Sequence, residues 1–402
     1  MTSDFLSADR LIASCADTAR DDGITIQTTF EPLAGYGSPV KPAIYSGGKY
    51  QEGSRWMSVD DVAPTPIIVI DNEASQANRL EGALLDYRVA LGLPHFVLDL
   101  AGCVLPPHLP RSLSSLQFPH RNADAYLRDS MLDGIAFMKT PSGKLVFDAT
   151  ADRPEALLQW MPASLLFGFW QSHLGSNRSQ AKLARCWTSQ IIGIAPASTS
   201  HTVNGTKGDP LNLSIANKID FLDNVEDWVV ADDLKAKAKS AGKGAEIGKD
   251  RLSEIGHGQV PFSEDRMALA PMSFRMIRQS STVSFASLRR VMCSDPRQSA
   301  EARAVLVALG LAAHTAAFGR SVSLRSGCDL RASSTTWTWN SPAGDVGFAP
   351  LGFDDATELF RSCVARAEAT GLPVGSVWAD TTFLLPNASL TKAIELTWPE
   401  VQ

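Results

Sequence analysis

The sequence predicts a mixed fold, α/β or α+β, because strand-like and helix-like segments alternate along the chain. Residues 67–70 form a short β-branched run after Pro64 and Pro66, which is typical of a buried strand. Residues 75–91 place Leu and Ala at steps of three and four, as one buried helical face requires. Residues 301–318 predict a second buried helix. The order of these elements along the chain does not fix the order of strands.

The remaining elements are predicted from the same patterns. Strands are expected at 95–100, 187–194, 283–288, 321–324 and 381–385, and helices after Asn122, from about Asn177 and over 356–369. Ser75 is the expected N-cap of the helix that follows the first strand. Pro162 should divide the apolar residues 157–170 into two short pieces.

Length and composition limit the possible classes of protein. With 402 residues and 44% hydrophobic content, the chain can bury a full core in one domain with insertions or in two or three domains. The net charge is −6, so nothing global indicates nucleic acid. Any RNA-binding surface must therefore gather its basic residues on one face.

The cysteines and the apolar runs indicate the compartment. Six cysteines lie far apart without a C-x-x-C pair, which argues against a zinc site and a dense disulfide framework. Residues 1–20 are interrupted by charges and lack the apolar centre of a secretory signal. The longest apolar run, 304–313, is about half of a membrane span. We therefore expect a cytoplasmic protein without a membrane partner.

The most informative feature is a stretch without acidic residues, 156–208, where the 43 acids of the chain predict about six. The stretch keeps four cations, Arg178, Lys182, Arg185 and Lys207. On a helix beginning near Asn177, the first three would share one face. Cations without nearby carboxylates suit a surface that follows a phosphate backbone. The alternative is a core segment that excludes acids and has a solvated basic edge.

Asn78 and Arg79 lie near the expected start of the first helix. A phosphate at a helix N-terminus gains contacts to free backbone amides, and Arg79 would add a charge-assisted hydrogen bond. The alternative is that Arg79 is an ordinary surface residue paired with Asp86 or Glu81.

Two later segments also suit a polyanion. The loop 201–213 has glycine-rich turns beside Lys207, although a plain surface loop has the same composition. Residues 232–261 carry basic side chains among Ala, Ser and Gly, including Lys235, Lys237 and Lys243. Because it has so few apolar side chains to pack into a core, this segment is expected to be mobile and to protrude from the fold, either as a basic arm or as a solvated loop. Residues 242–249 match neither a P-loop nor a dinucleotide fingerprint.

No pattern of an enzyme is found in the sequence. The seven histidines form neither H-E-x-x-H nor a metal-ligand spacing, and G-x-S-x-G is absent. His120 beside Arg121 is a possible acid-base element, but an isolated histidine is more often structural. We therefore expect no catalytic residue, no metal and no cofactor.

Seven segments occur in the chain in this order: IVIDNEASQANRLEG (68–82), PHRNADAYLRD (119–129), MPASLLFGFW (161–170), RSQAKLARCWTSQIIG (178–193), GTKGDPLNL (205–213), GHGQVPF (256–262) and RSGCDLR (325–331). This ordered set resembles the RAMP-superfamily backbone subunit of type I-U (also called I-G) CRISPR Cascade effector complexes. Residues 335–402 match no motif of that family.

The resemblance implies an α+β fold: an RRM-like (ferredoxin-like) palm with an inserted thumb hairpin and additional helical insertions. The palm would comprise residues 1–218 and 263–334, and the thumb would comprise 219–262. Residues 335–402 would be a C-terminal extension of unknown role.

The resemblance further implies a noncatalytic protein that oligomerises along a guide crRNA and presents it for pairing with target DNA in antiviral defence. Its partners would be crRNA, target DNA by way of the crRNA, further copies of itself and other Cascade subunits. The RNA-binding candidates are Asn78, Arg79, Arg178, Lys182, Arg185, Lys207, Lys235, Lys237 and Lys243. Acidic residues near the thumb lysines, such as Asp232 and Asp250, depart from a purely basic arm.

Two alternatives belong to other classes of protein. A RAMP-type endoribonuclease that processes or cuts RNA would use His120, His257 or Asp209. A small-molecule α/β enzyme has only the glycine-rich loops in its favour.

Overall fold

The computed structural model describes residues 6–171, 181–197, 218–221, 228–230, 250–251, 269–378 and 381–398. The chain forms two compact units. The larger comprises Met1–Tyr45, Tyr50–Ala197 and Met272–Gln402, and the smaller comprises Ser46–Lys49 and Ser198–Pro271. In the smaller unit, β13 (Lys218–Phe221) lies between β14 (Trp228–Val230) and β15 (Asp250–Arg251) in an antiparallel sheet.

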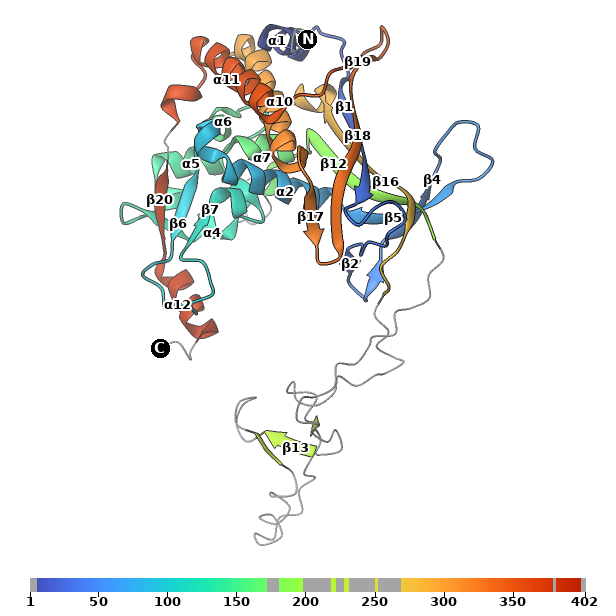
Figure 1. Ribbon diagram of the computed structural model, residues 1–402. Coiled ribbons are helices and arrows are strands. Elements are labelled where there is room, and N and C mark those ends of the chain that lie inside the picture. Colours follow the sequence, from blue (N-terminus) through green and yellow to red (C-terminus); the bar gives the residue numbers. More distant parts are fainter. Residues whose placement is uncertain are drawn as a thin grey trace. The chain divides into compact units, whose positions relative to one another are not determined.

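An antiparallel sheet dominates the larger unit, with the strand order β17-β18-β1-β16-β12-β5-β4 and with β19 paired to β18 (Figure 1). These strands are β1 (Gly23–Pro32), β4 (Glu52–Arg55), β5 (Thr65–Asp71), β12 (Trp187–Pro196), β16 (Phe274–Ser284), β17 (Val322–Arg325), β18 (Cys328–Asn340) and β19 (Val346–Phe348). The central strands come from distant parts of the chain, because β1 lies between β16 and β18.

The two faces of this sheet differ in chemistry. In β1, Ile24 and Ile26 are buried, whereas the alternate residue Gln27 is exposed. Thr25 pairs in register with Thr282 of β16 and with Thr338 of β18, so hydroxyl side chains continue across three strands of the other face. Because successive side chains of a strand point to opposite faces, one face packs against the core and the other is polar.

Helices cover the apolar face. α10 (Ser299–Phe318) contacts α1 (Ala8–Cys15), α2 (Glu73–Asp86) and α11 (Phe353–Ala369), and α10 and α11 run side by side in Figure 1. The stretch Pro296–Phe318 has the length and mean hydropathy of a membrane span, but 89% of its apolar window is buried inside the protein. A helix that is apolar all round and packed by helices and a sheet is a core helix.

Gly310 lies where α10 crosses Trp187 of β12, and a Cβ atom there would be 2.5 Å from Cε3 of the indole ring. We expect Gly310→Ala to lower the free energy of unfolding by about 1–3 kcal/mol, because the buried ring has no room to move aside. Gly82→Ala is the matched control, since no atom lies within 4 Å of its added Cβ. Urea denaturation measures both variants. Equal destabilisation of the two would contradict the packing argument.

A second sheet has the order β7-β6-β20-β8-β9. Its strands are β6 (Phe96–Asp99), β7 (Ser112–Ser114), β8 (Ser130–Leu132), β9 (Ile135–Ala136) and β20 (Thr382–Pro386). The other elements are β2 (Ile44–Tyr45), β3 (Lys49–Tyr50), β10 (Phe169–Gln171), β11 (Ala181–Leu183), α3 (Arg88–Leu91), α4 (Ala125–Arg128), α5 (Pro141–Phe147), α6 (Glu155–Trp160), α7 (Pro162–Phe167), α9 (Phe285–Leu288), α12 (Ala388–Thr397), η1 (Ser115–Gln117), η2 (Arg121–Ala123), η3 (Phe137–Lys139), η6 (Pro296–Gln298) and η7 (Gly375–Val377).

Most predicted elements are confirmed. β5, β6, β12, β17 and β20 contain most of the residues predicted as strands there, and α2, α10 and α11 match the predicted long helices. Pro162 does separate α6 from α7, because its ring fits the first turn of a new helix and not a helix interior.

Three local predictions are wrong. Residues 283–288 are not one strand, because β16 ends at Ser284 and α9 follows. The predicted helix after Asn122 is only the short α4, and Met131 and Leu132 belong to β8. Residues 181–183 form β11 and not part of a helix, so the helical spacing of Lys182 and Arg185 does not hold. Arg178 lies outside the described residues.

The C-terminal residues are built into the larger unit. The boundary predicted at residue 335 falls inside β18, which pairs with β1 over most of its length. Farther along, α11 packs on α10, and β20 pairs in parallel with β6. Of the predicted thumb, 219–262, the structure describes only β14, β15 and the part of β13 that follows Lys218.

Candidate nucleic-acid interface

Helix α2 organises the candidate interface. Asn72 caps it by accepting a hydrogen bond from the Ser75 backbone N–H at 2.9 Å, so Asn72 and not Ser75 is the N-cap. Asn78 and Arg79 therefore lie in the second turn, where backbone N–H groups already bond within the helix. The prediction that a phosphate would meet free amides at these two residues is wrong.

One side of α2 holds a charged cluster around Asp71, the last residue of β5. The buried Asp71 carboxylate accepts hydrogen bonds from Arg79 Nε at 2.8 Å and from Arg325 Nη2 at 3.0 Å. Ser75 Oγ donates a further bond at 2.8 Å. The partner of Arg79 is therefore Asp71, and not Asp86 or Glu81. Two guanidinium groups on one carboxylate leave the cluster with a net positive charge.

The two arginines of this cluster are only partly available to a ligand. Their side chains are 28% and 24% exposed, and Arg79 Nη2 also donates to the Leu324 carbonyl at 2.8 Å. A groove of about 330 Å³ opens beside Arg79, with Arg320, Ser321, Ser323 and Asp86 on its walls. The groove combines two cations with one acid, so its charge alone does not select a phosphate.

A buried polar network ties α2 to the main sheet. Gln76 Nε2 donates to Asp71 at 2.5 Å, and Gln76 Oε1 accepts from Ser189 Oγ at 2.8 Å and Gln279 Nε2 at 2.7 Å. These residues belong to α2, β5, β12 and β16. Gln279 Oε1 has no hydrogen-bond partner, but the other hydrogen bonds link the helix to three strands and so favour one packing of the helix on the sheet.

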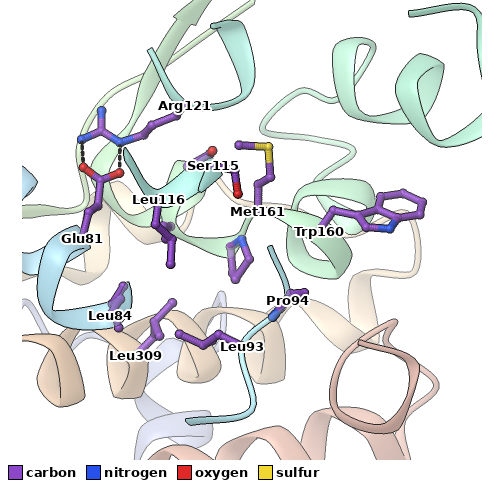
Figure 2. Close-up of a pocket in the computed structure, with 13 residues that line it drawn as sticks. Glu81, Leu84, Leu93, Pro94, Ser115, Leu116, Arg121, Trp160, Met161 and Leu309 are labelled. Atoms are coloured by element: carbon purple, nitrogen blue, oxygen red, sulfur yellow. Dashed lines mark hydrogen bonds and ion pairs between the residues drawn. The ribbon is translucent and has the colours of Figure 1, made fainter. Parts of the chain in front are cut away.

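The other side of α2 holds a second ion pair. Arg121 Nε and Nη2 donate to the two Glu81 carboxylate oxygens at 2.7 and 2.9 Å, as Figure 2 shows. Burial raises the pKa of Glu81, and the charge of Arg121 opposes that rise. Arg121 adopts φ +54°, and its Nη1 donates to the Gly168 carbonyl at 3.1 Å. Arg121 therefore connects α2 to the chain entering β10.

β10 and β11 form an antiparallel hairpin with two different sides. Phe169 pairs in register with Leu183, and both are buried. Trp170 pairs with Lys182, and the lysine Nζ lies 5.7 Å from the centroid of the Trp170 ring. Trp170 is 60% exposed. The hairpin therefore displays an aromatic ring and a cation side by side.

Arg185 follows this hairpin and reaches the first residue of α2. Its Nη1 lies 3.3 Å from a carboxylate oxygen of Glu73, and both side chains are substantially exposed. The expectation that Arg185 lacks an acidic partner is therefore wrong, although an exposed pair of this kind contributes little and exchanges readily. An incoming phosphate can compete with Glu73 for this guanidinium.

The other predicted site residues are distributed as follows. Asn78 is exposed on α2. Lys207, Lys235, Lys237 and Lys243 lie outside the described residues, as do His257 and Asp209 of the nuclease alternative. His120 is exposed, and its backbone N–H donates to Asp124 at 2.8 Å. In the described part of the chain, no three His, Cys, Asp or Glu side chains gather as a metal site would require.

Sequence reasoning missed Asp71, Arg325, Glu81, Arg121 and Trp170 as parts of this surface. A buried acid that directly ends a β-branched strand was the one available signal for Asp71. Glu81 and Arg121 are 40 positions apart, and no local pattern couples them.

The comparison with protein families matches this same region. Residues 24–196 match the family model described as CRISPR-associated protein GSU0053 (Cas_GSU0053). No match was found among curated proteins. The matched segment begins in β1, ends with β12, and includes α2, the Glu81–Arg121 pair and the β10–β11 hairpin. In this segment the chain is similar to a CRISPR-associated protein family.

Proposed function

We propose that the chain is a noncatalytic backbone subunit of a type I-U (I-G) Cascade complex in the cytoplasm. In this proposal, copies of the chain oligomerise along a crRNA, hold its backbone together with the other Cascade subunits, and present it for pairing with target DNA. The observation that carries the proposal is the strand order at the centre of the main sheet, in a chain whose segment 24–196 is CRISPR-associated.

The strand order supports an RRM-like palm. The central strands run β18-β1-β16-β12, each antiparallel to its neighbour. α2 lies in the connection from β1 to β12, and α10 lies in the connection from β16 to β18. Two β-α-β units arranged in this way are the ferredoxin-like pattern. β13, β14 and β15 come between β12 and β16 in the sequence, which is the place proposed for the thumb.

The chemistry of the surfaces supports contact with an RNA backbone more than with base edges. Thr25 and Gln27 of β1 pair in register with Thr282 and Ser280 of β16, so the centre of the polar sheet face has no aromatic platform. Instead, Lys182 offers a cation on the β10–β11 hairpin, and Arg185 offers one beside Glu73 of α2. Contacts to phosphates tolerate any sequence, and modest affinity per copy suffices when many copies share one guide.

The first test is co-expression of the chain with its neighbouring genes. The purified protein is expected to carry RNA of uniform length, because a complex with a fixed number of subunits protects a fixed length of guide. RNA of random length, or none, would contradict the proposal. Cutting of repeat RNA that disappears in a His120→Ala variant would favour the ribonuclease instead.

The second test reverses two charges. Lys182→Glu combined with Arg185→Glu is expected to weaken RNA binding about tenfold or more near 0.1 M salt. The reason is that each lost phosphate contact lowers the salt slope, which is the slope of the logarithm of the binding constant against the logarithm of the salt concentration, by about 0.7. Fluorescence anisotropy over a salt series measures both quantities. Arg297→Glu is the matched control, because Arg297 is likewise paired with a carboxylate, Asp295, at 2.7 Å. Unchanged RNA binding in the double variant would remove these residues from the interface.

A further inference from the structure

We propose that Trp170 is a stacking platform for one base of a single-stranded RNA, and that Lys182 contacts the phosphate beside that base. This inference rests on the proposed function, because it names how the same surface holds RNA. It also places a base contact on the β10–β11 hairpin, outside the thumb and outside the residues that the charge pattern identified.

The register of the β10–β11 hairpin places Trp170 and Lys182 on the same side. Trp170 and Lys182 are directly opposite each other on adjacent strands, and both point away from the side that buries Phe169 and Leu183. The lysine Nζ lies 5.7 Å from the ring centroid, within the range of a cation–π contact. With Lys182 in that position, 60% of the tryptophan is still exposed. The indole therefore keeps surface on which a base can stack.

The base of the hairpin is anchored to the rest of the chain by close backbone contacts. Gly168 adopts φ +77°, and a Cβ atom there would lie 2.7 Å from the Leu183 carbonyl oxygen, so the strands approach closely at the base of the hairpin. The Cys186 backbone N–H donates to the Leu166 carbonyl at 3.0 Å, and Arg121 holds the Gly168 carbonyl. The ring is thus presented from a fixed base, and ordering it on binding costs little entropy.

The positive charge around the Trp170 ring favours RNA over a protein partner. Residues 156–208, which include the whole hairpin, contain no acidic side chain. Lys182 lies in β11, and Arg185 follows β11. In the described residues, Glu73 is the one carboxylate paired with either of them. Aromatic rings among cations bind single strands, because any base offers a face for stacking and each phosphate offers a charge.

The test measures binding of the full-length chain to fluorescein-labelled 12-nucleotide RNA, with an abasic ribose-phosphate oligomer of equal length as the second probe. Trp170→Ala is expected to weaken binding of the ordinary RNA by between about fivefold and 150-fold, the range for loss of one stacked base. The abasic oligomer should bind the variant and the wild-type chain equally. Trp170→Phe, which keeps an aromatic face, should retain most of the affinity.

Two controls make the outcomes separable. Trp56→Ala removes a tryptophan of similar exposure, 62%, and should leave both probes unaffected. Lys182→Ala should reduce the salt slope for both probes, whereas Trp170→Ala should not.

If Trp170→Ala binds ordinary RNA as the wild type does, or loses both probes equally, the stacking proposal is overturned. If the wild-type chain binds neither probe, the proposed function itself fails. A change confined to self-association in sedimentation would assign the ring to an interface between copies and overturn its role in stacking.

Discussion

Glu81→Leu is expected to lower the free energy of unfolding by about 3–5 kcal/mol, because it leaves the Arg121 guanidinium buried without its carboxylate. The two side chains are 5% and 12% exposed, so water cannot replace the lost partner. The released Arg121 would also lose its fixed position against the Gly168 carbonyl. Urea denaturation followed by tryptophan fluorescence measures the loss.

The double variant Glu81→Leu with Arg121→Met separates the penalty of an unpaired charge from the value of the pair. Replacing both partners by apolar side chains is expected to recover most of the lost stability, because buried ion pairs contribute little beyond their own desolvation. Arg331→Ala is the surface control. It breaks the exposed pair with Glu31 and should change stability by only about 0–1 kcal/mol. Equal destabilisation by the single and double variants would contradict this explanation.

Lowering the pH is expected to reduce the free energy of unfolding by about 3 kcal/mol through His314 alone. The reason is that a pKa shift of one unit corresponds to about 1.4 kcal/mol. Burial lowers the pKa of His314 from 6.5 to about 4. The imidazole lies in α10 among the rings of Trp187, Phe318 and Trp337, where a charged form has no solvation. The unfolded chain accepts the proton near pH 6.5, whereas the folded chain resists it until about pH 4.

The sign of this effect follows from the lowered pKa. The stabilisation is complete above pH 6.5 and is lost as the pH falls towards 4. His314→Leu should remove this part of the pH dependence, so the stability difference between variant and wild type should change across that window. Urea denaturation at several pH values measures it, with the exposed His120→Ala as control. A constant difference between the two proteins across the window would show that His314 does not titrate as its burial requires.

The sequence by itself determined the elements whose pattern is local. The runs of β5, α10 and α11 could be predicted because an apolar strand or helix face repeats at a fixed spacing within one segment. The motif order likewise indicated a CRISPR-associated protein, which the match over residues 24–196 supports independently. The predicted helix near Asn177 failed where β11 forms, because pairing with β10 outweighs the local preference of a short segment.

Only the tertiary structure decided the strand order and the partners of the charged residues. Arg79 and Arg325 meet on Asp71 although Arg325 is 254 positions from it, and Arg121 meets Glu81 across 40 positions. Trp170 and Lys182 become neighbours through the register of β10 and β11. The physical reason is the same in each case: an ion pair or a cross-strand contact depends on the distance in space, and that distance exists only after the chain has folded.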